Sequence, residues 1–297
     1  MRKRESGAAR RSLAAASFAL TCGLCSLSSA QVTVAAPIAA AHDGSAACAT
    51  HLREIWALQL DARRSPAATL EALGVEHLWG TRNMRFVEVP GAAGAVLEVS
   101  FPKGSINPGN AQAPTGGAGF LYRGPVGRRD DTHACLSYEV MFPEQFEFGR
   151  GGKLPGLYGG AAPSGGANIR EHPGFSLRYM WRSGGVGEIY AYVPNKKNPV
   201  YGESIGRGRF SFVRGRWLRL EQQIILNQPQ MADGVLRVWE DGVQVIERQD
   251  IVYRTDAAVG ISGLMFSTFF GGHDATWASP QDQSIRFRNI RLLAQDP

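Results

Sequence analysis

The stretch "GFSLRYMWRSGGVGEIYAYV", residues 174–193, decides the fold class, because apolar and polar residues alternate on both sides of a glycine-rich turn. Successive side chains of a strand point to opposite faces. One parity of the first half holds Phe175, Leu177, Tyr179 and Trp181, and the other holds Ser176, Arg178, Met180 and Arg182. The pattern predicts a hairpin of two strands, at 174–182 and 187–193, with Trp181 in the core.

The register of this hairpin follows from the length of its turn. If the turn is the three residues 183–185, Arg178 faces Tyr190 and Ser176 faces Tyr192. Directly opposed residues have Cβ atoms roughly 5 Å apart. Two phenols, a serine and a guanidinium would then share one patch, and a turn of even length would stagger them without changing their faces.

The rest of the chain repeats the strand pattern. Further strands are expected at 95–101, 134–142, 209–213, 216–226, 234–247, 259–270 and 284–293, since clusters of Gly, Pro, Asn and Asp separate these stretches. Helical spacing at 51–63 and 65–73 predicts a short helical N-terminal segment. We therefore expect an all-β fold, an antiparallel β-sandwich of the jelly-roll kind.

The N-terminus has the features of a secretory signal over residues 1–30: a basic start, an apolar run and small residues ending at Ala30. We expect 31–50 to be flexible and 51–297 to form one domain in a secreted or periplasmic monomer. No later apolar run is long enough to suggest a membrane span. Cys48 and Cys135 remain after cleavage, and they can form a disulfide in an oxidising compartment.

Charge is concentrated in residues 150–219, which hold twelve Lys and Arg against three Glu. The rest of the mature chain is acidic, so the protein as a whole is near neutral. A cationic segment on such a chain indicates a polyanionic partner, although a solvated basic face would have the same composition. A secreted, nearly neutral chain does not favour nucleic acid as that partner.

The stretch "GRGGKLPGLYGG", residues 149–160, places Lys153 among six glycines. It lacks the spacing of a phosphate-binding loop, because Leu154 follows the lysine. We expect a flexible loop whose glycines let the backbone approach a polymer and whose lysine meets an anionic group. No spacing of His or Cys predicts a metal site, and no cofactor is expected.

A lysine, an arginine and tyrosines together suit β-elimination of a polyuronate. A base removes the proton at C5 of the sugar, and the oxygen at C4 leaves with a proton. Cations or hydrogen bonds that neutralise the neighbouring carboxylate stabilise the transition state. A tyrosine with a pKa of roughly 10 is a poor base. We therefore expect Arg178 and Lys153 to lower the pKa of a tyrosine.

Motifs in matching order over about residues 134–292 resemble polysaccharide lyase family 14. They are "GGKLPGLYGG" (151–160), "FSLRYMWR" (175–182), "GEIYAYVP" (187–194), "FSTFFGGHDATW" (266–277) and "FRNI" (287–290). The resemblance implies a β-jelly roll that cleaves acidic polysaccharides without metal or cofactor. It assigns the active residues to Lys153, Ser176, Arg178, Tyr190 and Tyr192.

In the roles that the resemblance implies, Lys153 and Arg178 engage the uronate carboxylate, and Tyr190 acts as base or acid. Tyr192 and Ser176 assist. Many fungal relatives carry cysteines where this chain has Pro163 and Gly174. The disulfide that braces their glycine-rich loop is therefore missing here.

Other residues are expected to bind substrate: Arg182, Tyr158, Lys196, His273 and Trp277. The preferred substrate is an alginate or polymannuronate type of polyuronate. A glucuronan lyase is the alternative enzyme. A non-catalytic module that binds acidic polysaccharide is the alternative outside catalysis.

Overall fold

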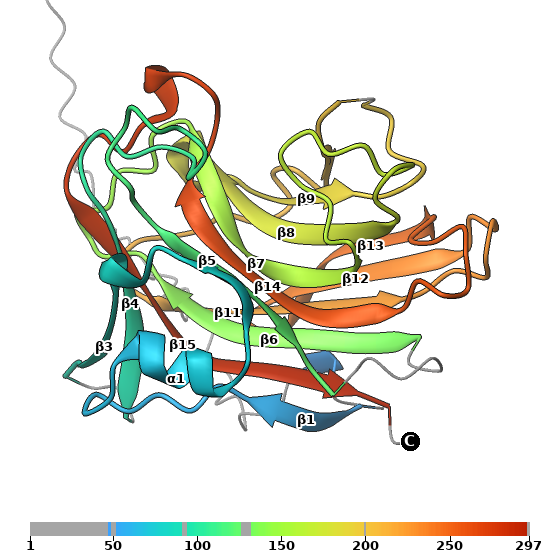
Figure 1. Cartoon of the computed structure of the whole chain (residues 1–297), viewed down its shortest axis with the longest axis horizontal. Helices are drawn as coiled ribbons and strands as arrows, with labels where there is room; N and C mark the ends of the chain where they lie inside the picture. Colours follow the sequence, from blue (N-terminus) through green and yellow to red (C-terminus); the bar gives the residue numbers. More distant parts are fainter. Residues whose placement is uncertain (1–46, 49–51, 91–93, 126–131, 199, 296–297) are drawn as a thin grey trace, which may run out of the picture. The chain divides into compact units, whose positions relative to one another are not determined.

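The computed structural model describes residues 47–48, 52–90, 94–125, 132–198 and 200–295. The expected signal peptide, 1–30, lies outside the described residues, as does nearly all of the expected flexible segment, 31–50. Within the described part, two antiparallel sheets lie against each other as layers (Figure 1). This arrangement confirms the predicted all-β jelly-roll class.

The first sheet, called the back sheet, has the strand order β13-β12-β11-β6-β15-β4-β3, and β1 also pairs with β15. Its strands are β1 (Arg53–Ala57), β3 (Met84–Glu88), β4 (Ala95–Phe101), β6 (His133–Met141), β11 (Trp217–Ile225), β12 (Gly234–Glu240), β13 (Val243–Ile251) and β15 (Gln283–Ala294). A turn at Asp241-Gly242 divides the stretch expected to be strand at 234–247 into β12 and β13.

The second sheet, called the cleft sheet, has the order β10-β9-β8-β7-β14-β5-β2. Its strands are β2 (Glu76–Trp79), β5 (Ala118–Arg123), β7 (Gly151–Gly160), β8 (Gly174–Arg182), β9 (Gly187–Tyr192), β10 (Glu203–Ile205) and β14 (Ile261–Phe270). Short 3₁₀ turns connect some strands: η2 (Thr81–Asn83), η3 (Ser183–Gly185) and η4 (Ala275–Trp277).

The β8–β9 hairpin has the predicted register, with Ser176 opposite Tyr192 and Arg178 opposite Tyr190. Its apolar set, Phe175, Leu177, Tyr179 and Trp181, is fully buried between the sheets. Trp181 packs edge-to-face on the rings of Phe101, Phe142 and Phe270, and such contacts contribute about 0.5–1.5 kcal/mol each beyond burial. The apolar face anchors β8, so its other parity faces away from the core.

The helix expected at 51–63 is wrong, because residues 53–57 form β1. They pair with the C-terminal half of β15, where Arg53 lies opposite Ala294. The hydrogen bonds and side-chain packing gained by pairing with β15 stabilise the strand more than the weak helical propensity of these residues stabilises a helix. The helix α1 (Pro66–Ala72) lies within the expected range 65–73, and Ser65 Oγ accepts a hydrogen bond from Ala68 N at 3.3 Å.

The strand expected at 209–213 is also wrong. These residues contribute only an isolated bridge between Ser211 and Val186. The alternating pattern is nevertheless real, because Phe210 and Phe212 are both buried. The main chain of this segment forms turns and bends instead of extending a sheet.

The predicted disulfide joins Cys48 to Cys135, with the two Cα atoms 6.4 Å apart. Cys135 lies on β6, and both cysteines pack with Leu52 and Leu293. The bond ties the N-terminal segment to the middle of the back sheet.

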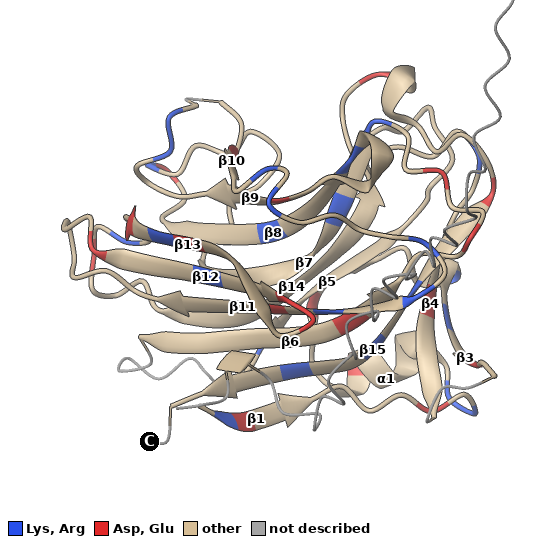
Figure 2. Cartoon of the chain, turned by 180° about the vertical axis from the view of Figure 1, so that it is seen from behind, with Lys and Arg blue, Asp and Glu red and all other residues tan. Residues whose placement is uncertain are grey.

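Charges on the back sheet are largely paired with each other. Arg288 forms an ion pair with Glu139 at 2.6 Å. Glu98 forms ion pairs with Arg286 at 2.9 Å and with Arg85 at 3.1 Å. Figure 2 shows blue and red segments side by side on these strands. Among the described residues, no helix is long and apolar enough to cross a membrane.

Candidate active site

The glycine-rich stretch around Lys153 is the strand β7, so the predicted loop is wrong. It lies between β8 and β14 in the middle of the cleft sheet. A Cβ at Gly152 would lie 2.1 Å from the Trp181 ring, and one at Gly156 would lie 1.8 Å from the Leu177 carbonyl oxygen. The glycines therefore allow close packing within the protein, rather than close approach of a polymer.

A bulge in β7 places Lys153. The register of β7 shifts between Lys153 and Gly156 against β8, and a matching shift separates it from β14. Pro155 has no N–H to give to a ladder. Its carbonyl oxygen accepts a hydrogen bond from Tyr138 Oη on the back sheet at 3.2 Å. The bulge is thus formed by the sequence of β7 and held from the opposite sheet.

Gln222 of β11 completes this support. Its Oε1 accepts a hydrogen bond from Leu157 N at 2.7 Å, and its Nε2 donates to Leu177 O at 2.9 Å. Leu157 and Leu177 are opposed in the β7–β8 pair directly after the bulge. Gln222 is fully buried, so its amide fixes β7 relative to β8 where the ladder is interrupted.

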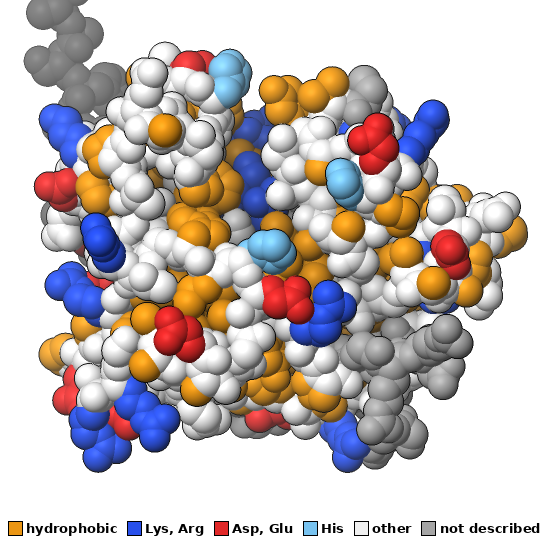
Figure 3. All heavy atoms as spheres, in the orientation of Figure 1, with side chains coloured by type: hydrophobic (Ala, Val, Ile, Leu, Met, Phe, Trp, Pro, Cys, Tyr) orange, Lys and Arg blue, Asp and Glu red, His pale blue; other side chains and the backbone are white. Residues whose placement is uncertain are grey.

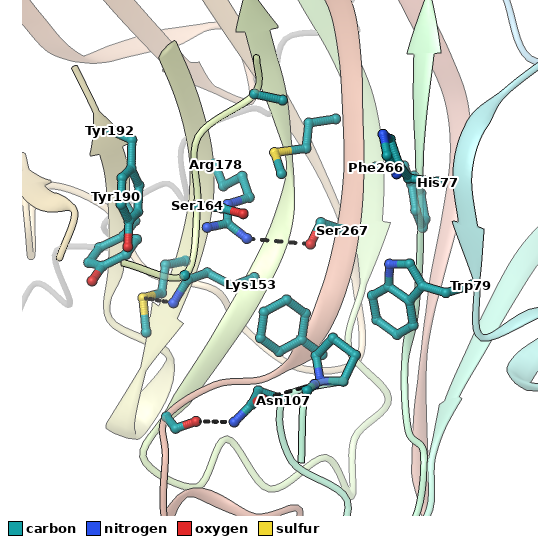
Figure 4. Close-up of a pocket in the computed structure, with 18 of the residues that line it drawn as sticks. His77, Trp79, Asn107, Lys153, Ser164, Arg178, Tyr190, Tyr192, Phe266 and Ser267 are labelled. Carbon is teal, nitrogen blue, oxygen red and sulfur yellow. Dashed lines mark hydrogen bonds between the residues drawn. The ribbon is translucent and has the colours of Figure 1, made fainter. Parts of the chain in front are cut away.

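The polar parity of β8 and β9 faces a cleft of about 890 Å³. Figure 3 shows Lys and Arg atoms deep in a hollow, next to hydrophobic atoms. The close-up shows an asymmetric site, with Tyr190, Tyr192, Lys153 and Arg178 on one side and Trp79 on the other (Figure 4). A polymer in this cleft would meet charge on one wall and aromatic rings on the other.

Lys153 is only 7% exposed. Its Nζ lies 3.0 Å from Met180 Sδ and 4.3 Å from the centre of the Tyr190 ring. Burial, and then the positive charges of Arg178 and Arg182, hold the pKa of Lys153 well below its ordinary value. Glu188 opposes this shift only in part. The amine at the centre of the cleft therefore loses its proton far more readily than an exposed lysine.

Arg178 is 3% exposed and lies on the same wall. Its Nη1 is 3.5 Å from Ser267 Oγ, and its Nε has no hydrogen-bond partner among the described residues. Burial lowers the pKa of Arg178 to about 10, while Tyr192 and Tyr190 act in the opposite direction. A buried guanidinium with donors left over is suited to binding a carboxylate.

The expectation that cations lower the pKa of the tyrosine is wrong for Tyr190. Burial raises the pKa of Tyr190 to about 12, because it outweighs the lowering by the Gly202 backbone, Arg182 and Arg178. The Tyr190 and Tyr192 rings meet edge-to-face with centroids 5.9 Å apart. Tyr190 is thus held neutral, and a neutral phenol donates a proton rather than accepting one.

Ser176 and Tyr192 hold the loop that follows β7. Ser176 Oγ donates to Pro163 O at 2.6 Å, and Tyr192 Oη accepts from Gly166 N at 3.0 Å. Ser176 is fully buried and does not line the cleft. These two bonds brace the loop at Pro163.

Two residues expected to bind substrate do not reach the cleft. Tyr158 is fully buried against Ala162 and Met265, and burial raises its pKa to about 12. Lys196 lies outside the lining, with Nζ donating to Asn198 O and 5.9 Å from the Tyr192 ring. A bulge changes which residues of β7 face the cleft, and the sequence pattern does not show the bulge. The prediction that Tyr158 binds substrate is therefore wrong.

The other three expected binding residues, Arg182, His273 and Trp277, line the cleft. The site also contains residues that the sequence interpretation did not assign to it: His77, Trp79, Asn107, Met180, Tyr201 and Ser267. Met180 lies on the same face of β8 as Arg178, so the alternation of this strand could have predicted its place in the cleft. His77 and Trp79 lie on β2, at the far edge of the sheet, and only the strand order brings them here.

In the described part of the chain, no group of three or more His, Cys, Asp or Glu is placed to hold a metal ion. The cationic and phenolic side chains that line the cleft are able to bind an anion and to transfer protons.

Comparison with known proteins identifies a protein family and solved structures with the same fold. The family model described as polysaccharide lyase 14 matches residues 90–290. The PL-14 alginate lyase of Aplysia kurodai is 31% identical, with a TM-score of 0.71, over 82% of this chain and 99% of that one. Alginate lyase vAL-1 from Chlorella virus is 23% identical, with a TM-score of 0.67, over 82% and 100%.

A third structure, the endo-β-1,4-glucuronan lyase of the fungus Trichoderma reesei, shares the fold at 10% identity. Its TM-score is 0.54, over 82% of this chain and 96% of that one. No curated protein matches the chain.

Proposed function

The chain belongs to polysaccharide lyase family 14, and we propose that it is a secreted enzyme that cleaves a mannuronate-rich, alginate-type polyuronate by β-elimination. The observation that carries the proposal is the buried guanidinium of Arg178 beside the buried amine of Lys153 in one cleft. Within the part of the chain that the structure describes, neither makes an ion pair with a carboxylate. A buried charge is costly unless a partner compensates it, and a uronate carboxylate supplies that partner.

The closeness of Lys153 Nζ to the Tyr190 ring, together with opposite pKa shifts, supports an assignment of the proton transfers. Lys153 has a lowered pKa and Tyr190 a raised one, and groups shifted apart in this way serve as base and acid. The Lys153 amine takes the proton from C5, the C4–O bond breaks as the C4–C5 double bond forms, and Tyr190 gives its proton to the leaving oxygen. Exchange with water then resets both groups.

Arg178 makes this step possible by binding the carboxylate on C5. Its positive charge stabilises the enediolate-like transition state and offsets the negative charge that would otherwise raise the pKa of Lys153 again. A dry, pre-formed wall strengthens both interactions. Ser176 and Tyr192 act on the neighbouring loop and keep this wall in place.

The position of the two proton-transfer groups also bears on the sugar. Lys153 Nζ lies 4.3 Å from the centre of the Tyr190 ring, so we place the loss of the C5 proton and the protonation of the C4 oxygen on one side of the sugar ring. In mannuronate and glucuronate, the C5 hydrogen and the C4 oxygen lie on one side of the ring, and in guluronate they lie on opposite sides. The geometry therefore favours mannuronate, with glucuronate as the alternative because the two differ only at C2.

The test is a direct assay of the purified mature protein. Polymannuronate, polyguluronate, glucuronan and hyaluronan are incubated separately, with chelator present, and ultraviolet absorbance follows the new conjugated double bond. We expect the fastest rise with polymannuronate. A faster rise with glucuronan would select the alternative enzyme. Binding without any rise would favour the non-catalytic module.

Secretion is proposed from residues 1–30 alone. Mass spectrometry of protein recovered outside the producing cells is expected to show a chain that begins at Gln31. A chain that remains inside the cytoplasm and retains Met1 would contradict this.

Tyr190→Phe removes the proposed acid while keeping the ring beside Lys153. We expect kcat to fall by about 10²-fold, because the leaving oxygen loses its proton donor. The rate should still rise with pH through the lowered pKa of Lys153, since the base is unchanged.

The control for this variant is Tyr122→Phe, at a partly buried tyrosine outside the cleft whose ring stacks on Trp56, and it should retain nearly full activity. Loss of the rising limb of the pH profile in Tyr190→Phe would show instead that the tyrosine is the base.

A further inference from the structure

A second hollow of about 330 Å³ adjoins the cleft. It is lined by Arg150, Arg182, Ser183, Val186, Arg207 and Trp277. Arg182 and Trp277 also line the main cleft, so the two hollows are neighbours. Three guanidinium groups from separate segments therefore meet at one end of the site, and in the proposed elimination none of them contacts the reacting sugar.

Two of these arginines share one buried carboxylate. Arg182 donates to Glu188 Oε1 from Nη2 at 2.6 Å and from Nε at 2.9 Å, and Arg207 Nε lies 3.3 Å from Glu188 Oε2. Glu188 is fully buried and also accepts from Ser204 Oγ at 2.6 Å. Its charge fixes the two guanidinium groups and neutralises only one of them. The side chain of Arg207 is 54% exposed, which leaves it open to a ligand.

Arg150 and Trp277 form the other side of the hollow. Arg150 Nη1 donates to Thr276 Oγ1 at 2.5 Å, and its guanidinium lies 4.7 Å from the centre of the Trp277 ring. Trp277 packs directly on the backbone of Gly272, where a Cβ would lie 2.1 Å from the ring. The hydrogen bond and the packing place both side chains before any ligand arrives, which lowers the entropic cost of binding.

The direction of β8 connects the hollow with the site of elimination. Arg178 and Arg182 lie four residues apart on the same face of this strand, which corresponds to roughly 13 Å. That span exceeds one sugar ring. A polyuronate carries a carboxylate on every sugar, so a chain lying along β8 with one carboxylate on Arg178 brings a later one to the hollow.

We propose that the hollow formed by Arg150, Arg182, Arg207 and Trp277 is a distal subsite that binds the carboxylate of a second uronate, so that the polymer runs along β8. This inference rests on the proposed function. The subsite adds binding energy away from the reacting sugar, so its effect depends on the length of the substrate.

The experiment compares wild type with Arg150→Gln/Arg207→Gln on mannuronate oligomers from the trimer to the octamer. We expect kcat/KM of wild type to rise with length until the hollow is filled. In the variant this rise should be lost, which leaves kcat/KM on long oligomers about 3- to 10-fold lower and on the trimer unchanged. Added salt should reduce the difference.

Arg63→Gln/Arg64→Gln is the matched control, because it removes two exposed arginines outside both hollows. An equal loss at every length, or no loss at any length, would overturn the subsite. If wild type cleaves none of the oligomers, it is the proposed function that fails, and direct binding of the octamer by calorimetry then tests the subsite by itself. Equal octamer affinity in wild type and variant would overturn it.

Discussion

Lys153→Met is expected to reduce turnover of the polyuronate by about 10³-fold or more and, at the same time, to make the protein more stable. Methionine fills a similar volume but has no amine to take the C5 proton. Stability rises because the wild type buries a cation whose charge is compensated only in part. We expect the free energy of unfolding to increase by at least about 1 kcal/mol at neutral pH.

The dependence of this gain on pH follows from the lowered pKa. The unfolded chain binds the Lys153 proton more tightly than the folded one, so wild type gains stability as pH rises toward the ordinary lysine value of 10.5. The cost of the buried charge is present in full below the lowered pKa of the folded state. The difference in stability between variant and wild type should therefore shrink at alkaline pH.

The measurement is chemical denaturation of both proteins at several pH values, together with the ultraviolet assay. Lys103→Met is the control, because Lys103 is exposed and lies outside the cleft. It should change neither stability nor turnover appreciably. A well-folded Lys153→Met that retains turnover would remove Lys153 from the mechanism.

Gln222→Leu is expected to destabilise the protein by about 2–4 kcal/mol although the side chain keeps its size. Leucine leaves Leu157 N and Leu177 O without the partner that the amide supplies. Each buried backbone group without a hydrogen bond costs about 1–3 kcal/mol. Because these groups lie directly after the bulge, we also expect Lys153 and Arg178 to be held less firmly, and kcat to fall about tenfold at temperatures where the variant is folded.

Gln223→Leu is the matched control. Gln223 is the next residue on β11, and its Oε1 accepts from Arg237 Nη1 at 3.2 Å on the same sheet. We expect it to leave kcat unchanged. The comparison uses denaturation and steady-state rates, with near-ultraviolet circular dichroism to confirm packing. Unchanged stability and kcat in Gln222→Leu would show that the bulge does not need support from the back sheet.

Local sequence determined the hairpin of β8 and β9, including its register and the side chains that face the cleft. Alternation has a period of two and the turn has three residues, so nothing distant was needed to place Arg178 opposite Tyr190. The same local reasoning placed most strands of the back sheet, but only β8, β9 and β14 of the cleft sheet. It failed at residues 53–57, where pairing with β15 decides the structure.

Only the tertiary structure decided how Lys153 is presented and how it titrates. The glycine content predicted a loop, but β7 is a strand that pairs with β8 and β14. Its glycines leave room for the Trp181 ring and the backbone of β8, which lie closer than a Cβ would allow. The aromatic wall of Trp79 comes from a strand that is distant in sequence. Burial raises the pKa of Tyr190 despite its cationic neighbours, because desolvation depends on everything packed around the phenol and not on the residues next to it in the chain.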